Sequence, residues 1–204
     1  MIAIVNYGSG NIHAIGNIYN NLNIEYYVAS TPEELMNATS IILPGVGAFD
    51  QAMGELERSG MREALDIMVL ERKVNILGIC VGMQLLAKTS DEGIKSGLGW
   101  INGHVKKFDH AKFSQATHLP HMGWNTVNIE KESKLFNNVD LELGYYFLHS
   151  YYFECLNKED ILTSTFYGDT FTSSVNLENV YGAQFHPEKS HNPGIQLLKN
   201  FANL

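Results

Sequence analysis

A cysteine between two glycines, Cys80 in Gly78-Ile79-Cys80-Val81-Gly82, is the residue best suited to nucleophilic chemistry. It follows directly on an apolar run, and a buried strand that ends in Gly-x-Cys-x-Gly makes the sharp strand-to-helix turn that presents a nucleophile. Side chains at the glycine positions would obstruct that turn. The N–H groups at the start of the next helix point at the sulfur and favour the thiolate. The alternative is a small cysteine buried in a parallel strand.

His186 and Glu188 supply the two further groups that a cysteine nucleophile requires. One is a base that removes the thiol proton and later protonates the leaving group, and the other is an acceptor that orients the base. Their i, i+2 spacing across Pro187 lets both side chains emerge on the same side of an extended segment. A surface histidine and a solvated acid are the alternatives for each residue alone. The occurrence of all three residues at predicted strand ends disfavours both alternatives.

The segment Gly45-Val46-Gly47 and the N–H of Val81 are candidate donors for the oxyanion of an acyl transfer. Val81 begins the helix after Cys80, where the first N–H groups have no partner within the helix. The flanking glycines let the Val46 peptide adopt, or switch to, a backbone orientation that bulkier residues would prevent. The segment lacks the lysine and the full glycine pattern of a phosphate loop. A tight turn after a strand is the alternative.

Strands that alternate with helices must position these groups in the first half of the chain. Apolar runs predict buried strands, and apolar residues at helical spacing predict helices. Pro44 and Gly45 are expected to end the third strand. The alternation predicts a parallel sheet covered on both faces. The predicted strands are residues 2–7, 25–29, 40–43 and 74–79. The predicted helices are residues 12–22, 50–58 and 61–71, and a further short helix is predicted to start within residues 30–34.

After about residue 90 strand-like segments replace this alternation, and we expect several of them to be antiparallel. The predicted strands are residues 105–108, 126–129, 145–153, 162–167 and 180–185, and a final helix is predicted over residues 194–203. The sequence therefore predicts a three-layer α/β fold, with a largely parallel central sheet and a mixed, partly antiparallel extension in its second half. We expect one domain over residues 1–204. Ligands of open α/β sheets bind at the carboxyl ends of strands, where the candidate residues fall.

Composition restricts the classes of partner. The chain has 204 residues and a net charge of −8, which argues against nucleic acid or an anionic membrane as the main partner. Two cysteines are too few for a disulfide framework, the first residues lack the basic region of a signal peptide, and no apolar run is long enough to span a membrane. We expect a cytoplasmic protein without a metal or cofactor. His186-Pro187-Glu188 contains the His-x-Glu of a zinc deaminase, but Pro-Cys-x-x-Cys is absent.

The pair of motifs around Cys80 and His186, residues 78–84 and 184–188, resembles the signature of class I glutamine amidotransferases. More narrowly, the chain is similar to the glutaminase subunits of imidazole glycerol phosphate synthases, and the similarity extends from residue 6 to the final helix. Three segments carry it: Leu43-Pro44-Gly45-Val46-Gly47-Ala48-Phe49, Pro120-His121-Met122-Gly123-Trp124-Asn125 and Phe147-Leu148-His149-Ser150-Tyr151-Tyr152.

The resemblance implies hydrolysis of the side-chain amide of L-glutamine through a γ-glutamyl thioester on Cys80. His186 would be the general base and acid, Glu188 would orient it, and Val81 with Val46 would form the oxyanion hole. Glu92 would accept the α-ammonium of the substrate, although a solvated loop acid is its alternative. The residues implied for substrate binding are Gly45, Gly47, Gln84, Glu92, His149, Ser150 and Tyr151.

The resemblance also implies that ammonia passes to a (βα)₈-barrel synthase subunit in a heterodimer. There it would react with a phosphoribulosyl formimino aminoimidazole carboxamide ribonucleotide to give imidazole glycerol phosphate and an aminoimidazole carboxamide ribotide for histidine biosynthesis. The implied interface is residues His121, Met122, Gly123, Trp124 and Asn125, which combine a large aromatic ring with methionine and polar groups. A core tryptophan and a turn asparagine are the alternative.

Divergence after Gly10-Asn11, where the family runs into Leu-x-Ser and this chain has Ile12-His13-Ala14, leaves a second acceptor open. A paralogous glutaminase that supplies a sugar amidotransferase in surface-glycan synthesis would keep the same triad. A stand-alone cysteine hydrolase would not need the segment over residues 120–125. A catalytically inactive interaction subunit is disfavoured because nucleophile, base and orienting acid are all present.

Overall fold

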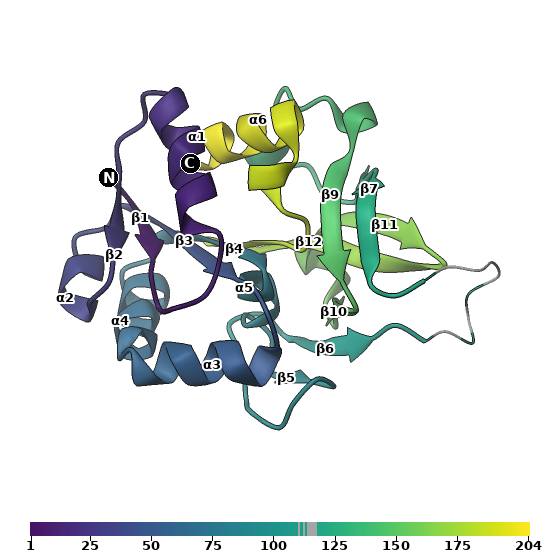
Figure 1. Cartoon of the computed structure of the whole chain (residues 1–204), viewed down its shortest axis with the longest axis horizontal. Helices are drawn as coiled ribbons and strands as arrows, with labels where there is room; N and C mark the ends of the chain where they lie inside the picture. Colours follow the sequence, from purple (N-terminus) through teal and green to yellow (C-terminus); the bar gives the residue numbers. More distant parts are fainter. Residues whose placement is uncertain (110, 112, 114–117) are drawn as a thin grey trace.

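The computed structural model describes residues 1–109, 111, 113 and 118–204, and a large mixed sheet crosses it (Figure 1). Within these residues the sheet has eleven strands. Its parallel half consists of β2 (Tyr26–Ala29), β1 (Ile2–Val5), β3 (Ser40–Gly45), β4 (Asn75–Cys80) and β13 (Val180–Ala183). It continues through β12 (Asp169–Leu177) and β10 (Tyr151–Cys155) to β6 (Gly103–Lys107) and β5 (Thr89–Ser90). β11 (Ile161–Tyr167) pairs with β12, and β8 (Asn128–Ile129) pairs with β11.

Helices cover both faces of the parallel half. Figure 1 shows α1 (Ile12–Asn21) and α6 (His191–Phe201) on one face, and α3 (Phe49–Arg58) and α4 (Met61–Asp66) on the other. β1 and β3 are buried at every position, as a sheet covered on both faces requires. The three-layer α/β fold predicted from the sequence is confirmed. No helix among the described residues is both long and apolar enough to cross a membrane.

Shorter helical elements join these layers. Thr31 caps α2 (Pro32–Leu35), because its hydroxyl accepts the Glu34 N–H at 3.3 Å, which confirms the predicted helix start. The others are α5 (Val81–Gln84), a π-helical turn that prolongs α4 over Ile67–Glu71, and 3₁₀ turns over Lys134–Phe136, Leu141–Leu143, Lys158–Asp160 and Pro187–Lys189.

The prediction that Pro44 and Gly45 end the third strand is wrong. β3 runs through both residues, and Pro44 lies opposite Ile79 of β4. β3 pairs with β1 only as far as Ile42. Beyond that residue one side of β3 has no partner strand, which is where a sheet tolerates proline. The extension carries Gly45 to a position beside Cys80.

The single strand predicted over residues 145–153 is two strands in different sheets. β9 (Tyr145–His149) pairs antiparallel with β7 (His121–Asn125) in a separate two-stranded sheet, and β10 joins the central sheet after Ser150. Figure 1 shows β7 and β9 together beside the central sheet. Hydropathy could not place this boundary, since aromatic residues occur on both sides of it.

Strand β12 was not predicted from the sequence. It pairs with β10, β11 and β13, so the second half of the sheet is built around it. Its central residues Thr172, Ser173 and Ser174 are buried, although hydroxyl side chains give no apolar signal. The hydroxyl of Thr163 on β11 bonds with those of Ser173 and Ser174 at 2.8 and 2.6 Å, which satisfies these polar groups inside the protein.

Three glycines allow β3, β4 and α5 to pack backbone against backbone below the turn at Cys80. A Cβ atom on Gly82 would collide with the carbonyl oxygen of Leu43. A Cβ atom on Gly45 would lie 2.5 Å from the Gly82 nitrogen, and one on Gly78 would lie 2.5 Å from the Gly82 oxygen. The glycines of the Gly-x-Cys-x-Gly motif are therefore required by the contact of α5 with two strands.

Gly82→Ala should lower the free energy of unfolding by about 1–3 kcal/mol, because the added methyl group forces backbone segments apart. Gly54→Ala is the matched control. Gly54 lies within α3, and its added Cβ would have ordinary contacts at 3.6 Å, so this change should raise the free energy of unfolding by up to about 1 kcal/mol. Urea denaturation measures both. Equal effects of the two substitutions would refute the packing explanation.

Candidate active site

The ends of three parallel strands place the nucleophile. The register sets Gly45 of β3 opposite Cys80 of β4, and Ala183 of β13 opposite Ile79. Cys80 has φ 55° and ψ −114°, a conformation that residues other than glycine rarely adopt. The chain turns there from β4 directly into α5, and the tight packing around it holds the strained backbone. The Cys80 side chain lines a cavity of about 310 Å³.

His186 lies next to Cys80, and Glu188 lies next to His186. The His186 Nδ1 atom is 2.8 Å from Glu188 Oε1, and the two side chains are only 4% and 1% exposed. The imidazole also interacts with Cys80, which favours its charged form. Since Nδ1 is engaged by the carboxylate, Nε2 is the nitrogen left for the sulfur. The structure thus brings together all three residues of the predicted triad.

The charge on His186 depends on these two neighbours. Burial alone would lower the pKa of its imidazole, but the hydrogen bonds and charges of Cys80 and Glu188 raise that pKa to about 10. His186 is therefore an imidazolium at neutral pH, held between a carboxylate and the sulfur. Asn11, which precedes α1, donates its amide to Glu188 Oε1 at 3.3 Å and helps to fix the carboxylate.

The cavity collects most of the predicted substrate-binding residues. Three further residues that the sequence did not single out also line it: Pro120, Leu148 and Lys189. Gly45 does not line it; the glycine lies under the cavity, packed against Gly82. The predicted residues in the cavity wall are Val46, Gly47, Cys80, Val81, Gln84, Glu92, His149, Ser150, Tyr151 and His186.

The Val46 peptide, a predicted oxyanion donor, is bonded to Ser9. The Val46 N–H donates to Ser9 Oγ at 3.0 Å, and the Ser9 hydroxyl donates to the Val46 carbonyl oxygen at 3.0 Å. In this conformation the N–H of Val46 is occupied by a side chain of the protein. Gly47 follows at φ 85°, which a bulkier residue would not readily adopt.

Glu92 lies at the cavity wall with one carboxylate oxygen engaged. Its Oε2 accepts the backbone N–H of Phe49 at 2.9 Å, at the first residue of α3. A carboxylate is favoured at this end of a helix. Within the described part of the chain no three His, Cys, Asp or Glu side chains are arranged to hold a metal ion.

A chain of hydrogen bonds joins the cavity wall to strand β7. The carbonyl oxygen of Tyr151 can only accept, so His149 Nδ1 donates to it at 2.8 Å. His149 Nε2 then accepts from His121 Nδ1 at 3.1 Å, and His121 Nε2 accepts from the Asn125 amide at 3.3 Å. Burial lowers the pKa of His121 to about 4 and that of His149 to about 3, so both rings are neutral.

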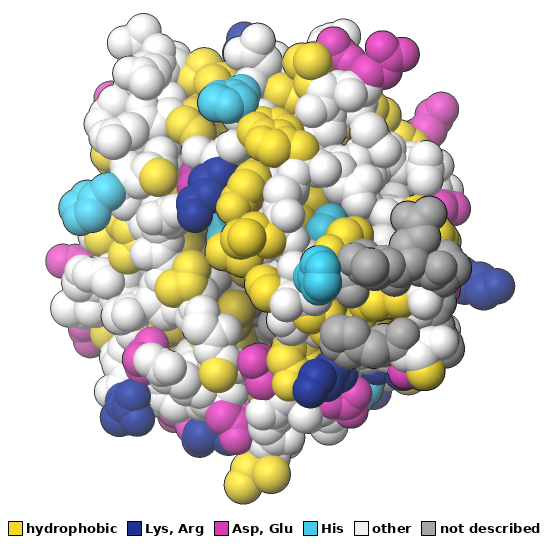
Figure 2. Space-filling view, turned by 45° about the vertical axis from the view of Figure 1, so that its right-hand side comes forward, with side chains coloured by type: hydrophobic (Ala, Val, Ile, Leu, Met, Phe, Trp, Pro, Cys, Tyr) yellow, Lys and Arg dark blue, Asp and Glu magenta, His cyan; other side chains and the backbone are white. Residues whose placement is uncertain are grey.

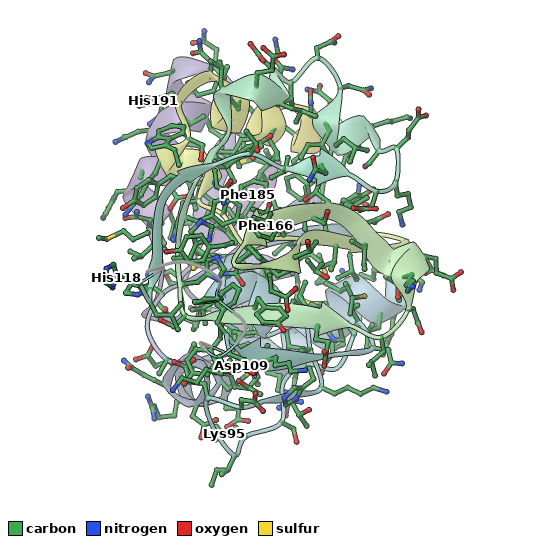
Figure 3. All side chains as sticks on the ribbon, turned by 90° about the vertical axis from the view of Figure 1, so that its right-hand side faces the viewer. Lys95, Asp109, His118, Phe166, Phe185 and His191 are labelled. Carbon is green, nitrogen blue, oxygen red and sulfur yellow. The ribbon has the colours of Figure 1, made fainter. Side chains whose placement is uncertain are left out.

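The predicted interface strand is divided between the interior and the surface. His121 is 2% exposed and stacks on Tyr167, whereas Met122 and Trp124 are 65% and 47% exposed. The Trp124 ring stacks on His191 at 5.2 Å. Figure 2 shows hydrophobic side chains gathered in a band on the side of the molecule that carries β7 and β9. His191 lies at the margin of the molecule in Figure 3, whereas Phe185 lies inside it.

Three residues behind the cavity wall were also given no role from the sequence: Ser9, Asn11 and Gln184. Ser9 and Asn11 belong to one short segment, Gly8-Ser9-Gly10-Asn11, which precedes α1. Gln184 stands in the His186 motif, and its amide lies 3.9 Å from the Cys80 sulfur. Buried polar residues next to a predicted catalytic motif are the signal that points to such partners.

Comparison with known proteins identifies the family of this chain. The family pattern described as "Glutamine amidotransferase class-I" matches residues 3–204. A crystal structure of a glutamine amidotransferase has the same fold, with a TM-score of 0.74 at 20% identity over 100% of both chains. The chain belongs to the class I glutamine amidotransferase family.

Two curated relatives are similar to the chain over its whole length. It is 48% identical over 204 residues to the imidazole glycerol phosphate synthase subunit HisH of Leptospira borgpetersenii, covering 100% of both chains. It is 52% identical over 204 residues to the subunit of the same name from Bdellovibrio bacteriovorus, again covering 100% of both chains. Within its family, the chain therefore groups with the HisH subunits of that synthase.

The buried histidines should titrate at opposite ends of the pH scale. In an NMR titration of the folded chain, His186 should keep its proton until about pH 10, whereas His149 and His121 should stay neutral down to about pH 3 and pH 4. Glu188→Gln should lower the pKa of His186, because it removes the carboxylate charge. Loss of the His186 proton near pH 6.5 would contradict the proposed ion pair.

These shifts also predict how stability depends on pH. His186 has a raised pKa, so its contribution to the free energy of unfolding is complete below about pH 6.5 and is lost as the pH rises towards 10. His121 and His149 have lowered pKa values, so they destabilise the fold as the pH falls from about 6.5 towards 4 and 3. Urea denaturation across this range should show both slopes, and His121→Phe should reduce the acidic one.

Proposed function

We propose that the chain is the glutaminase subunit of an imidazole glycerol phosphate synthase and acts as a single amidotransferase domain over residues 1–204. It hydrolyses L-glutamine to glutamate and ammonia. The observation that carries this proposal is the buried Cys80, His186 and Glu188 triad at a cavity of about 310 Å³. The relatives reported above are named for this synthase, which disfavours the sugar amidotransferase alternative.

The reaction begins with attack of the Cys80 thiolate on the side-chain carbonyl carbon of glutamine. His186, an imidazolium before attack, gives its proton to the departing amide nitrogen, and the carbon–nitrogen bond breaks to release ammonia. The product is a γ-glutamyl thioester. The neutral imidazole then removes a proton from water, which attacks the thioester; glutamate leaves, and thiolate and imidazolium are restored. Glu188 holds the ring in place throughout through its 2.8 Å contact with Nδ1.

Both tetrahedral intermediates place negative charge on the former carbonyl oxygen. The N–H of Val81, at the start of α5, is one donor for that oxygen. The N–H of Val46 is the second, once it leaves Ser9 Oγ. The resting arrangement therefore has one donor withheld, and glutamine hydrolysis depends on reorientation of the Val46 peptide.

The substrate occupies the cavity beside Cys80. Glu92 is an acceptor for its α-ammonium group, and the acid is already fixed by the N–H of Phe49. Gly47 offers backbone without a side chain, which leaves room for the ligand. Gln84, His149, Ser150 and Tyr151 complete the wall. Gly45 contributes by its position beneath Cys80 instead of by contact with the ligand.

The partner is a (βα)₈-barrel synthase subunit that forms a heterodimer with this chain and consumes the ammonia in histidine biosynthesis. Met122 and Trp124 form the exposed apolar part of its binding surface, and exposed aromatic and methionine side chains favour such contacts. Gly123 and Asn125 lie on the same strand, and His121 supports it from inside. The heterodimer works in the cytoplasm.

Cys80→Ala should lower glutamine-dependent synthesis of imidazole glycerol phosphate by roughly 10⁴-fold or more, because no other group can form the thioester. Synthesis from added ammonium salt should continue, since the barrel subunit does not use the cysteine. Measuring both nitrogen sources on the purified complex tests the assignment. Glutamine-dependent synthesis retained by Cys80→Ala would refute it, whereas loss of both activities would show that the complex fails to assemble.

The isolated chain should hydrolyse glutamine slowly and gain activity with the barrel subunit and its ligand, because Ser9 holds the Val46 N–H. Ser9→Ala should raise glutaminase activity of the isolated chain about fivefold, which corresponds to about 1 kcal/mol of lost hydrogen bonding. Ser9→Thr, which keeps the hydroxyl, is the control. Full activity of the unchanged chain alone would contradict the need for reorientation.

A further inference from the structure

Gln184 is a buried polar residue that neither the sequence nor the proposed reaction assigns. It directly follows β13, whose Ala183 lies opposite Ile79, so the next step of the register sets Gln184 beside Cys80. Its side chain is fully buried. A buried amide needs hydrogen-bond partners, because leaving one unpaired costs about 1–3 kcal/mol. The partners of Gln184 are the two residues that the reaction places against glutamine, Cys80 and Gln84.

The orientation of the Gln184 amide is fixed by a backbone carbonyl. The Tyr151 oxygen can only accept, so Gln84 must present its Nε2 there, at 3.1 Å. The same Nε2 lies 3.0 Å from Gln184, which must therefore present its oxygen. The remaining group of Gln184, its NH₂, is thereby directed to the Cys80 sulfur at 3.9 Å. No other assignment of the two amides satisfies all three contacts.

This arrangement distinguishes thiolate from thiol. The Cys80 sulfur lies 4.0 Å from the Leu148 carbonyl oxygen, which can accept a thiol proton and repels a thiolate. The NH₂ of Gln184 can donate to a thiolate, and hydrogen bonds to charged groups are the stronger ones. The Gln184 amide therefore offsets the Leu148 carbonyl at the moment when the sulfur carries charge.

We propose that Gln184 is a positioning residue of the glutaminase, whose amide donates to the Cys80 thiolate and holds Gln84 by its NH₂ group. Since both hydrogens of the Gln84 NH₂ are used by Tyr151 and Gln184, Gln84 meets its ligand only as an acceptor. One buried side chain thus orients both the nucleophile and a substrate-binding residue. The inference about substrate rests on the proposed glutaminase function; the contact with the sulfur does not.

Alkylation of Cys80 by iodoacetamide tests the contact without glutamine. A Cys155→Ser background leaves Cys80 as the only thiol, because the chain has two cysteines. Gln184→Glu keeps an acceptor for Gln84 but withdraws the donor from sulfur, and Gln184→Met removes both groups at similar size. Each should slow alkylation at pH 7 roughly tenfold or more and move the pH profile of the rate to higher pH.

Turnover in the complex with the barrel subunit separates the two roles. Gln184→Glu should lower kcat and leave KM for glutamine nearly unchanged, because Gln84 keeps its acceptor. Gln184→Met should lower kcat and also raise KM. Ser173→Ala is the structural control: Ser173 is buried on the adjacent strand and its hydroxyl bonds with Thr163, so this variant should alkylate with the parental pH profile.

Folded Gln184 variants that alkylate with the parental profile would overturn the proposal. Thermal melting establishes folding of each variant, and NMR on the unchanged chain covers the case in which both variants unfold. Alkylation of Cys80 should shift the side-chain amide signal of Gln184, and an unmoved signal would also overturn the contact. If the parent complex hydrolyses no glutamine while the alkylation profiles respond as stated, the proposed function fails and the role of Gln184 at the sulfur stands.

Discussion

The approach of α5 to strands β3 and β4, with Gly82 against the Leu43 carbonyl, is the contact on which the site depends. It permits the turn at Cys80 and holds a backbone conformation that a free chain would leave. Once this turn is fixed, the parallel register aligns Gly45, Cys80 and the residue after Ala183 in one row. The loops that follow these strand ends carry most of the groups around the sulfur, and the Leu148 carbonyl approaches it from β9.

Three buried histidines lie close together, and their neighbours decide which of them is charged. Without a carboxylate partner, His121 and His149 are neutral, since burial disfavours their charged forms. His186 is equally enclosed, yet Glu188 and Cys80 keep it charged. Of these three histidines, His186 alone is positively charged, and it is the one we propose as the general acid and base. Because the Glu188 carboxylate is itself buried, the imidazolium in turn stabilises the acid's negative charge.

The sequence predicted the triad because its residue types and motifs carry their own chemistry, and it predicted the parallel half of the sheet because buried strands there are continuously apolar. It failed where tertiary pairing decides. β12 is buried through hydroxyl groups that find partners on β11, and Pro44 is tolerated because β1 ends before it. The roles of Ser9 and Gln184 depend on which backbone group or amide lies opposite, and no spacing along the chain specifies that.

The hydrogen bonds from Asn125 through His121 to His149 form a chain in which every donor lies on the Asn125 side of its acceptor. Each ring carries its hydrogen on Nδ1, the nitrogen nearer the cavity, so the tautomer of one ring determines that of the next. Asn125 is the end that lies on β7, the strand we propose to bind the partner, and the Tyr151 carbonyl is the end at the cavity. Reversal of the polarity at one end would require proton exchange in both rings. The Tyr151 carbonyl can only accept and the Asn125 amide nitrogen can only donate, so the hydrogens between the surface and the cavity keep one arrangement.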